Sequence, residues 1–251
     1  MSEDLGFRFT WYGHSCVHLE TFEGSSVLLD PWFGNPSSPA GAESIARCEV
    51  MLVSHGHFDH LGAQPGEVLK ADSVTIARRT QPAWPSIHEL SLWLEGLDSL
   101  DTEVIGMNKG GTVATRGLRV SMVHADHSAG DWVATERVPL YLGEPVGFVV
   151  ELENGARVYF AGDTALFGDM RLIGEMHRPE VAFLPIGGHY TMDPPAAARA
   201  VELLGVRTVV PIHYGTFPVL VGTPDQLRDE LAARGLNDVT VLSPEPGQTL
   251  G

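Results

Sequence analysis

Short apolar runs bounded by turn residues recur along the whole chain and predict β-strands. Runs of this length, rich in Val, Ile and Phe and flanked by Gly, Pro, Asp or Ser, are typical of strands with buried faces. The predicted strands are 7–11, 17–19, 27–29, 50–54, 74–77, 103–105, 112–114, 118–123, 146–152, 157–160, 181–184 and 208–210.

Helical spacing appears between these runs. Residues 86–94 place apolar side chains three and four apart, with Ser86 at the N-cap position and Glu89 three residues later, as in a capping box. The segments 166–176 and 194–204 are also predicted to be helical.

A last helix is predicted after Thr223, because Thr223 suits the N-cap, Pro224 the first helical position and Gly235 the position beyond the end. Helices therefore recur among strands in both halves of the chain. This order predicts two sheets packed face to face with helices outside. With 251 residues, 43% of them hydrophobic, the chain is expected to form one domain over residues 1–251.

Net charge and cysteine content limit the partners and the cellular compartment that can be expected. The 16 basic and 32 acidic residues give a net charge of −16, which repels nucleic acid and anionic lipid. Cys16 and Cys48 form no metal-binding or redox motif and are expected to be free thiols. The acidic N-terminus does not resemble a signal peptide, and no apolar run approaches the ~20 residues that span a bilayer. We expect a soluble cytoplasmic protein without a membrane or nucleic-acid partner.

The most informative segment is residues 55–60, which read His-Gly-His-Phe-Asp-His directly after an apolar run. Alternate residues can converge on a turn, whereas a helix brings together residues three and four apart. Gly56 is expected to allow that turn to be tight. Imidazoles with a carboxylate suit Zn²⁺, Fe or Mn. The segment therefore predicts a metal site on a loop at the end of a strand.

Three further runs end in residues that bind metals. Residues 124–130 read His-Ala-Asp-His-Ser-Ala-Gly, 162–164 read Gly-Asp-Thr, and 213–216 read His-Tyr-Gly-Thr. Each alone is more often a turn or a hydrogen-bonded core histidine than a ligand, but together with 55–60 they favour one shared site. Because α/β folds place their sites at strand ends, we expect the four ends to meet at one sheet edge.

In this order the four segments resemble the metallo-β-lactamase superfamily. Further motifs are similar to a branch of metal-dependent hydrolases near ascorbate-6-phosphate lactonase and N-acyl-phosphatidylethanolamine phospholipase D. The resemblance implies an αββα four-layer sandwich, with two mixed β-sheets flanked by helices and a dinuclear site between the sheets. These further motifs lie at residues 13–15, 29–31, 107–111, 185–192 and 211–218.

The resemblance also implies seven metal ligands. His124 stays an alternative to His127, because both end the same strand, although only His127 has the His-Ser-x-Gly setting of the family. Asp30 is expected to support the ligand loop by hydrogen bonding. The implied ligands are His55, His57 and His127 for one metal, Asp59, His60 and His213 for the other, and Asp163 as the bridge.

Two divalent ions are the expected cofactors. Zn²⁺ is favoured because His57 stands where di-iron relatives typically carry Glu, and Mn²⁺ or Fe²⁺ also suits this donor set. Two metals about 3.5–4 Å apart can share a water and lower its pKa towards ~7. The expected reaction is hydrolysis of a small ester, lactone or phosphodiester by the hydroxide that bridges the metals.

Residues outside the metal ligands have candidate roles as well. Asp59 would orient the nucleophile or accept its proton, and His189, in a Gly-Gly-His-Tyr turn, would donate a hydrogen bond in the transition state. Further candidates for the pocket rim are His14, Trp132, Tyr190 and Phe217.

Other functions stay open. A non-catalytic metal-binding or regulatory protein would keep the same ligands. A nuclease is disfavoured by the acidic charge, a redox protein by His57 and the lack of a flavin domain, and an exported β-lactamase by the lack of an export signal. A small-molecule substrate and assembly into a homo-oligomer are the expected interactions.

Overall fold

The computed structural model describes residues 5–133 and 138–251. Within these residues, two seven-stranded sheets account for most of the strands. The first sheet has the order β16 (Thr249–Leu250), β1 (Phe7–Trp11), β2 (Val17–Thr21), β3 (Ser26–Leu29), β4 (Val50–Leu52), β5 (Ala83–Ile87) and β6 (Glu103–Met107).

The second sheet continues from the first through the β6–β7 connection. Its order is β15 (Thr240–Val241), β14 (Thr208–Ile212), β13 (Val181–Pro185), β12 (Arg157–Phe160), β11 (Val146–Glu151), β8 (Leu118–His124) and β7 (Thr112–Thr115). A separate antiparallel pair is formed by β9 (Asp131–Val133) and β10 (Val138–Leu140).

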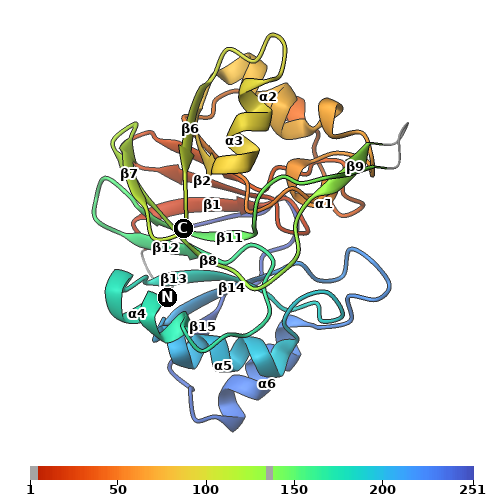
Figure 1. Ribbon diagram of the computed structural model, residues 1–251. Helices are drawn as coiled ribbons and strands as arrows, with labels where there is room; N and C mark the ends of the chain where they lie inside the picture. The colour runs from red at the N-terminus through yellow and green to blue at the C-terminus, as the bar shows by residue number, and fades with distance from the viewer. Residues whose placement is uncertain (1–4, 134–137) are drawn as a thin grey trace.

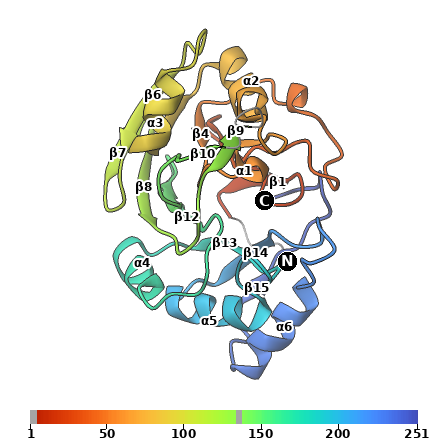
Figure 2. The ribbon, with the colours of Figure 1, turned by 45° about the vertical axis from the view of Figure 1, so that its right-hand side comes forward.

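Helices cover the outer face of each sheet, so the molecule has four layers (Figures 1 and 2). The first sheet carries α2 and α3, and the second carries α4, α5 and α6. This is the expected αββα sandwich of two mixed sheets, and the fold prediction is confirmed. The helices are α1 (Phe58–Leu61), α2 (Asp72–Thr80), α3 (His88–Glu95), α4 (Met170–His177), α5 (Pro194–Leu204) and α6 (Pro224–Ala233), with 3₁₀ turns at Ala42–Ser44 and Val68–Lys70.

The central strands are apolar without interruption because both of their faces are buried. In β13, Phe183 belongs to the core between the sheets, whereas Leu184 packs in the core beneath α4 to α6. The ring of Phe9 in β1 meets that of Phe183 edge-on at 5.3 Å and so joins the two sheets.

Three predicted elements were wrong in type or extent. Residues 74–77 lie in α2 rather than in a strand; short apolar runs fit either structure, and here Val74 and Ala77 share the buried face of a helix. The helix predicted from Ser86 begins at His88, because Ser86 pairs with Gly106 in the β5–β6 ladder. The helix predicted from residue 166 begins only at Met170.

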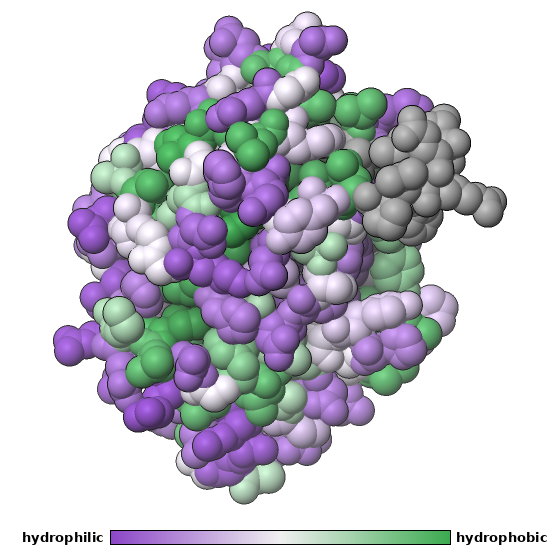
Figure 3. All heavy atoms as spheres, in the orientation of Figure 1, coloured by the Kyte–Doolittle hydropathy of each residue, from purple (hydrophilic) through white to green (hydrophobic). Residues whose placement is uncertain are grey.

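On the face shown in Figure 3, hydrophilic and apolar side chains are interspersed over both halves of the molecule. No helix among the described residues is long and apolar enough to cross a bilayer.

The capping box predicted at the start of α6 is confirmed. Gln226 N donates to Thr223 Oγ1 over 3.3 Å, and Thr223 N donates to Gln226 Oε1 over 2.9 Å. Thr223→Ala should therefore lower the free energy of unfolding by about 1 kcal/mol in urea titrations. Thr223→Ser should keep most of this stability, and equal midpoints for wild type and Thr223→Ala would contradict the prediction.

Candidate metal centre

The candidate site lies where loops leave the C-terminal ends of strands in both sheets. His55 follows β4 of the first sheet, while Asp163 and His213 follow β12 and β14 of the second. The expectation that these ends meet at one sheet edge was wrong. The site instead spans the two sheets at one end of the sandwich, as the family resemblance implied.

One group of ligand-type residues is His55, His57 and His127, whose nearest nitrogen atoms lie within 4.8 Å of one another. His55 Nε2 lies 2.8 Å from His57 Nδ1, and the His127 ring lies 5.2 Å from that of His55. The structure thus brings His127 to this group. His124 is exposed and packs its ring against Phe167.

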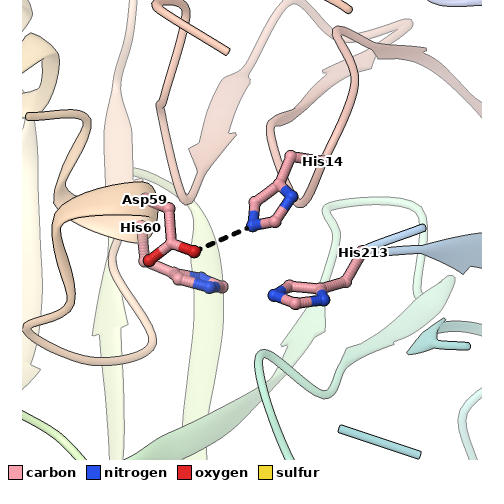
Figure 4. A group of neighbouring side chains, drawn as sticks. All are labelled: His14, Asp59, His60 and His213. Carbon is pink, nitrogen blue, oxygen red and sulfur yellow. Dashed lines mark hydrogen bonds and ion pairs between the residues drawn. The ribbon is translucent and has the colours of Figure 1, made fainter. Parts of the chain in front are cut away.

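The second group contains Asp59, His60 and His213 together with His14 (Figure 4). Asp59 and His60 project from α1, so only the first part of segment 55–60 is a loop, in contrast to the prediction. His14 was expected at the pocket rim, but it is fully buried. Its Nε2 lies 3.2 Å from Asp59 Oδ2 and its Nδ1 lies 3.1 Å from Thr216 Oγ1.

Asp163 lies between the two groups. Its Oδ2 atom is 3.0 Å from His213 Nε2, 3.3 Å from His60 Nε2 and 3.5 Å from His127 Nε2. Asp163 also forms a ligand-type group with His55 and His60. The carboxylate therefore contacts residues of both groups, which is the position expected of a bridging ligand.

Asp30 holds the ligand loop from behind, as predicted. Its Oδ1 accepts from Ser54 N over 2.7 Å, and its Oδ2 accepts from Ser54 Oγ over 2.7 Å. The same Oδ2 lies 2.6 Å from His60 Nδ1. This contact directs His60 Nε2 towards the site, because a carboxylate on one ring nitrogen fixes the orientation of the other.

Backbone strain is concentrated around the site. Asp30, His14 and His213 have φ angles of 43°, 51° and 54°, values that L-residues rarely adopt. The His14 carbonyl accepts from His213 N over 2.8 Å and from Trp11 Nε1 over 2.9 Å, so these strained turns hold each other across the two sheets.

Gly162 allows the two sheets to approach each other beside the ligands. It has φ 60°, and an added Cβ would lie 2.4 Å from Ser54 Cβ. Gly56 was expected to allow a tight turn, but its role is also to permit close packing. A Cβ at this position would lie 2.6 Å from Leu142 Cβ.

Several of the imidazoles are held neutral. Burial, strengthened by nearby His213, lowers the pKa of His14 to about 4. Burial also lowers the pKa of His57 to about 4 and that of His55 well below its usual value, and His60 adds to both effects. Neutral imidazoles are the form that binds metals.

His60 and Asp163 form a buried ion pair. Burial by itself lowers the pKa of His60, but Asp163 and Asp30 raise it well above its usual value. Burial by itself raises the pKa of Asp163, but His213 and His60 hold it well below its usual range. The raised pKa favours a doubly protonated His60, which would have to lose its Nε2 proton before this nitrogen could bind a metal.

The donor set fits divalent metals. Among the described residues, the buried atoms His60 Nε2 and Asp163 Oδ1 have no hydrogen-bond partner of good geometry. Such atoms cost about 1–3 kcal/mol each when unsatisfied. Nitrogen and carboxylate donors without a thiolate suit Zn²⁺, Mn²⁺ and Fe²⁺. Cys16 and Cys48 are free and buried and belong to none of the ligand groups found.

A pocket of about 570 Å³ opens onto the two groups. Of the predicted rim residues, Tyr190 and Phe217 line it. His189 is exposed with φ 60°, packs against Tyr190 and is not among the lining residues; its catalytic role stays a prediction. The side chain of Trp132 lies outside the described part of the structure. The lining residues are His57, Phe58, Asp59, His127, Ser128, Gly130, Asp131, Asp163, Tyr190, His213, Phe217 and Val219.

Comparisons with known proteins show the family of the chain. The beta-lactamase superfamily domain matches residues 25–214. A UPF0173 metal-dependent hydrolase of Koribacter versatilis is 40% identical over 245 residues, and the match covers 97% of each chain. A relative of the same name from Archaeoglobus fulgidus is 43% identical, over 96% of this chain and 97% of its own.

Among solved structures, Igni18, a metallo hydrolase from Ignicoccus hospitalis, has a TM-score of 0.79 at 35% identity and covers 97% of both chains. Fold and site thus define a metallo-hydrolase of the αββα type. The chain belongs to the metallo-β-lactamase superfamily and, within it, to the UPF0173 family of metal-dependent hydrolases. Its predicted proximity to ascorbate-6-phosphate lactonase and the phospholipase stays a prediction.

Asp30→Asn should weaken metal binding without changing any group that faces the pocket. The substitution keeps the shape of the side chain but removes the charge that orients His60. We expect a 10- to 100-fold loss of Zn²⁺ affinity, measured by competition with a chromogenic chelator. Asp72→Asn, which removes a carboxylate that accepts from Phe33 N, is the control, and equal affinity in both variants would contradict the role of Asp30.

Metal binding should release protons. His60 must lose the proton that Asp163 and Asp30 stabilise, whereas His14, His55 and His57 are already neutral near pH 7. The apparent affinity should therefore increase with pH until the raised pKa of His60 is passed. Titration calorimetry with Zn²⁺ in buffers of different ionisation enthalpy measures this release, and a buffer-independent heat would contradict it.

Proposed function

We propose that this protein is a dinuclear metal-dependent hydrolase of a small ester, lactone or phosphodiester. The observation that carries the proposal is the position of Asp163, in contact with ligand-type residues of both groups. His55, His57 and His127 would hold one metal, Asp59, His60 and His213 the other, with Asp163 shared. Bound there, two divalent metals lower the pKa of a water towards ~7 and polarise the electrophile.

The remaining chemistry falls to the side chains of the chain itself. In the tautomer that carries its proton on Nε2, His14 donates to Asp59 and accepts from the Thr216 hydroxyl. Burial alone would raise the pKa of Asp59, but the hydrogen bond from His14 and the charge of His60 lower it. Asp59 also lines the pocket, so its ionised carboxylate can accept the proton that the attacking water gives up.

The aromatic wall of the pocket would exclude bulk water from the reacting group. Phe58 and Phe217 both line the pocket beside the metal ligands. Removing water strengthens the interaction of the ionised ligands with charge that develops on the substrate. A non-catalytic metal-binding protein would need the ligands but would have no need for a pocket that reaches them.

Asp163→Ala should abolish both full metal loading and hydrolysis. The variant removes the carboxylate that both metals would share, so we expect metal content to fall from two equivalents towards one or fewer. Elemental analysis and hydrolysis of lactones and chromogenic phosphodiesters, each with and without chelator, measure the two effects. Asp126→Ala, an exposed acidic residue on the loop before His127, is the control. Chelator-sensitive turnover that persists in Asp163→Ala would overturn the bridging role. A wild-type protein that binds two metals but hydrolyses none of these compounds would favour a binding protein.

A further inference from the structure

One wall of the pocket is apolar and held in place by aromatic packing. Phe217 stacks on Trp32 at 5.9 Å between ring centroids, and Trp32 meets Phe58 edge-on at 5.6 Å. Trp32 is only 4% exposed, so a buried side chain supports the two rings that line the pocket. Tyr190 and Val219 extend the apolar wall to the pocket mouth, where they are 59% and 42% exposed. An apolar substituent would therefore find a preformed surface.

The polar part of the pocket lacks the cationic side chains of an anion-binding site. No Lys or Arg lines the pocket within the described part of the chain. Besides the candidate ligands, the polar groups of the lining are the hydroxyls of Ser128 and Tyr190 and the carboxylate of Asp131, which is 9% exposed and accepts from Gly66 N over 3.3 Å. Proteins recognise phosphate and carboxylate groups mainly through Arg, Lys and clustered N–H groups. A second anionic group on a substrate would therefore find no cationic partner among the described lining residues and would face the Asp131 carboxylate.

We propose that the site acts on uncharged carboxylic esters or lactones that carry an aromatic or branched apolar group, and that it discriminates against substrates with an additional phosphate or carboxylate. This inference rests on the proposed function and narrows it. In the reaction, water adds to the carbonyl carbon, the acyl C–O bond breaks, and a lactone becomes a carboxylate with a free hydroxyl group. The proton that water loses passes to Asp59 and from there to the departing alkoxide oxygen, and the carboxylic acid so formed loses its proton to solvent.

The test uses two lactones that share the reacting ring and differ in one substituent, γ-phenyl-γ-butyrolactone and γ-carboxy-γ-butyrolactone. With the Zn²⁺-loaded protein, kcat/KM for the phenyl compound should exceed that for the carboxylate by at least ~10-fold, since a buried phenyl group gains apolar contact and the carboxylate gains no partner. Equal values, or a preference for the carboxylate, would overturn the inference while leaving the hydrolase proposal intact.

Two variants test whether the apolar wall causes the preference for the phenyl lactone. Phe217→Ala should reduce kcat/KM for the phenyl lactone by ~10-fold more than it reduces that for unsubstituted γ-butyrolactone. Val219→Arg, at a partly exposed position where the longer side chain can reach solvent, should raise kcat/KM for the carboxylate and so reduce or reverse the preference. Phe22→Ala, an exposed aromatic residue beyond the far end of β2, is the matched control and should change neither value. Unchanged selectivity in Val219→Arg would overturn the inference.

Binding measurements distinguish a failure of this inference from a failure of the proposed function. The corresponding γ-phenyl and γ-carboxy lactams resist hydrolysis, and calorimetry measures their affinity for the same protein. Tighter binding of the phenyl lactam by ~10-fold, without chelator-sensitive turnover of any lactone, ester or phosphodiester, would overturn the hydrolase proposal and support the apolar pocket. Tighter binding of the carboxy lactam would overturn the pocket assignment whatever the turnover.

Discussion

The buried carboxylate of Asp163, in contact with three imidazoles, is the interaction on which the site depends. His60 comes from the first sheet, whereas His127 and His213 come from the second. A buried charge is tolerated only when it is paired, so the carboxylate constrains how the two sheets can sit against each other. The same contact stabilises a proton on His60, which a metal would have to replace. In the proposed site, metal binding and the packing of the sandwich would therefore be coupled through Asp163.

This coupling explains why strained backbone is found here. His14 and His213 adopt left-handed conformations that cost of order 1 kcal/mol or more each. Each is held by the hydrogen bond from His213 N to the His14 carbonyl and by the stacking of Trp11 on Tyr214 at 5.1 Å. Strain that is maintained by surrounding packing keeps side chains in place before a ligand arrives. The ligand-type residues are accordingly preorganised by the fold itself.

Sequence reasoning predicted the sandwich, and the resemblance to the metallo-β-lactamase superfamily implied the seven proposed ligands, whose motifs lie close to strand ends in the chain. It could not place His14 in the second group, since that position depends on how the turn after β1 meets the turn after β14. It also assigned residues 74–77 to a strand, because four apolar-rich residues carry no helical period by themselves. Gly56 was read as a turn residue, although the constraint on it is the approach of Leu142 from a distant segment.

The pocket wall was predicted in part, since Tyr190 and Phe217 were expected at the rim and line the pocket, whereas Val219 was not singled out from the sequence. Ligands follow the ends of central strands, whose positions are fixed by the core, whereas Tyr190, Phe217 and Val219 lie on loops beyond those ends. Loops can change without disturbing the strands that carry the metal ligands, so substrate choice and metal chemistry are separable in this fold. Phe217 cannot change as freely as the other two wall residues, because Trp32 and His14 both contact its ring. His14 also contacts Asp59, so the substrate-facing wall is packed against the residue that positions the proposed proton acceptor. A bulky apolar group pressed against Phe217 would therefore be located relative to the reacting centre, which is how binding of a remote substituent can contribute to kcat as well as to KM.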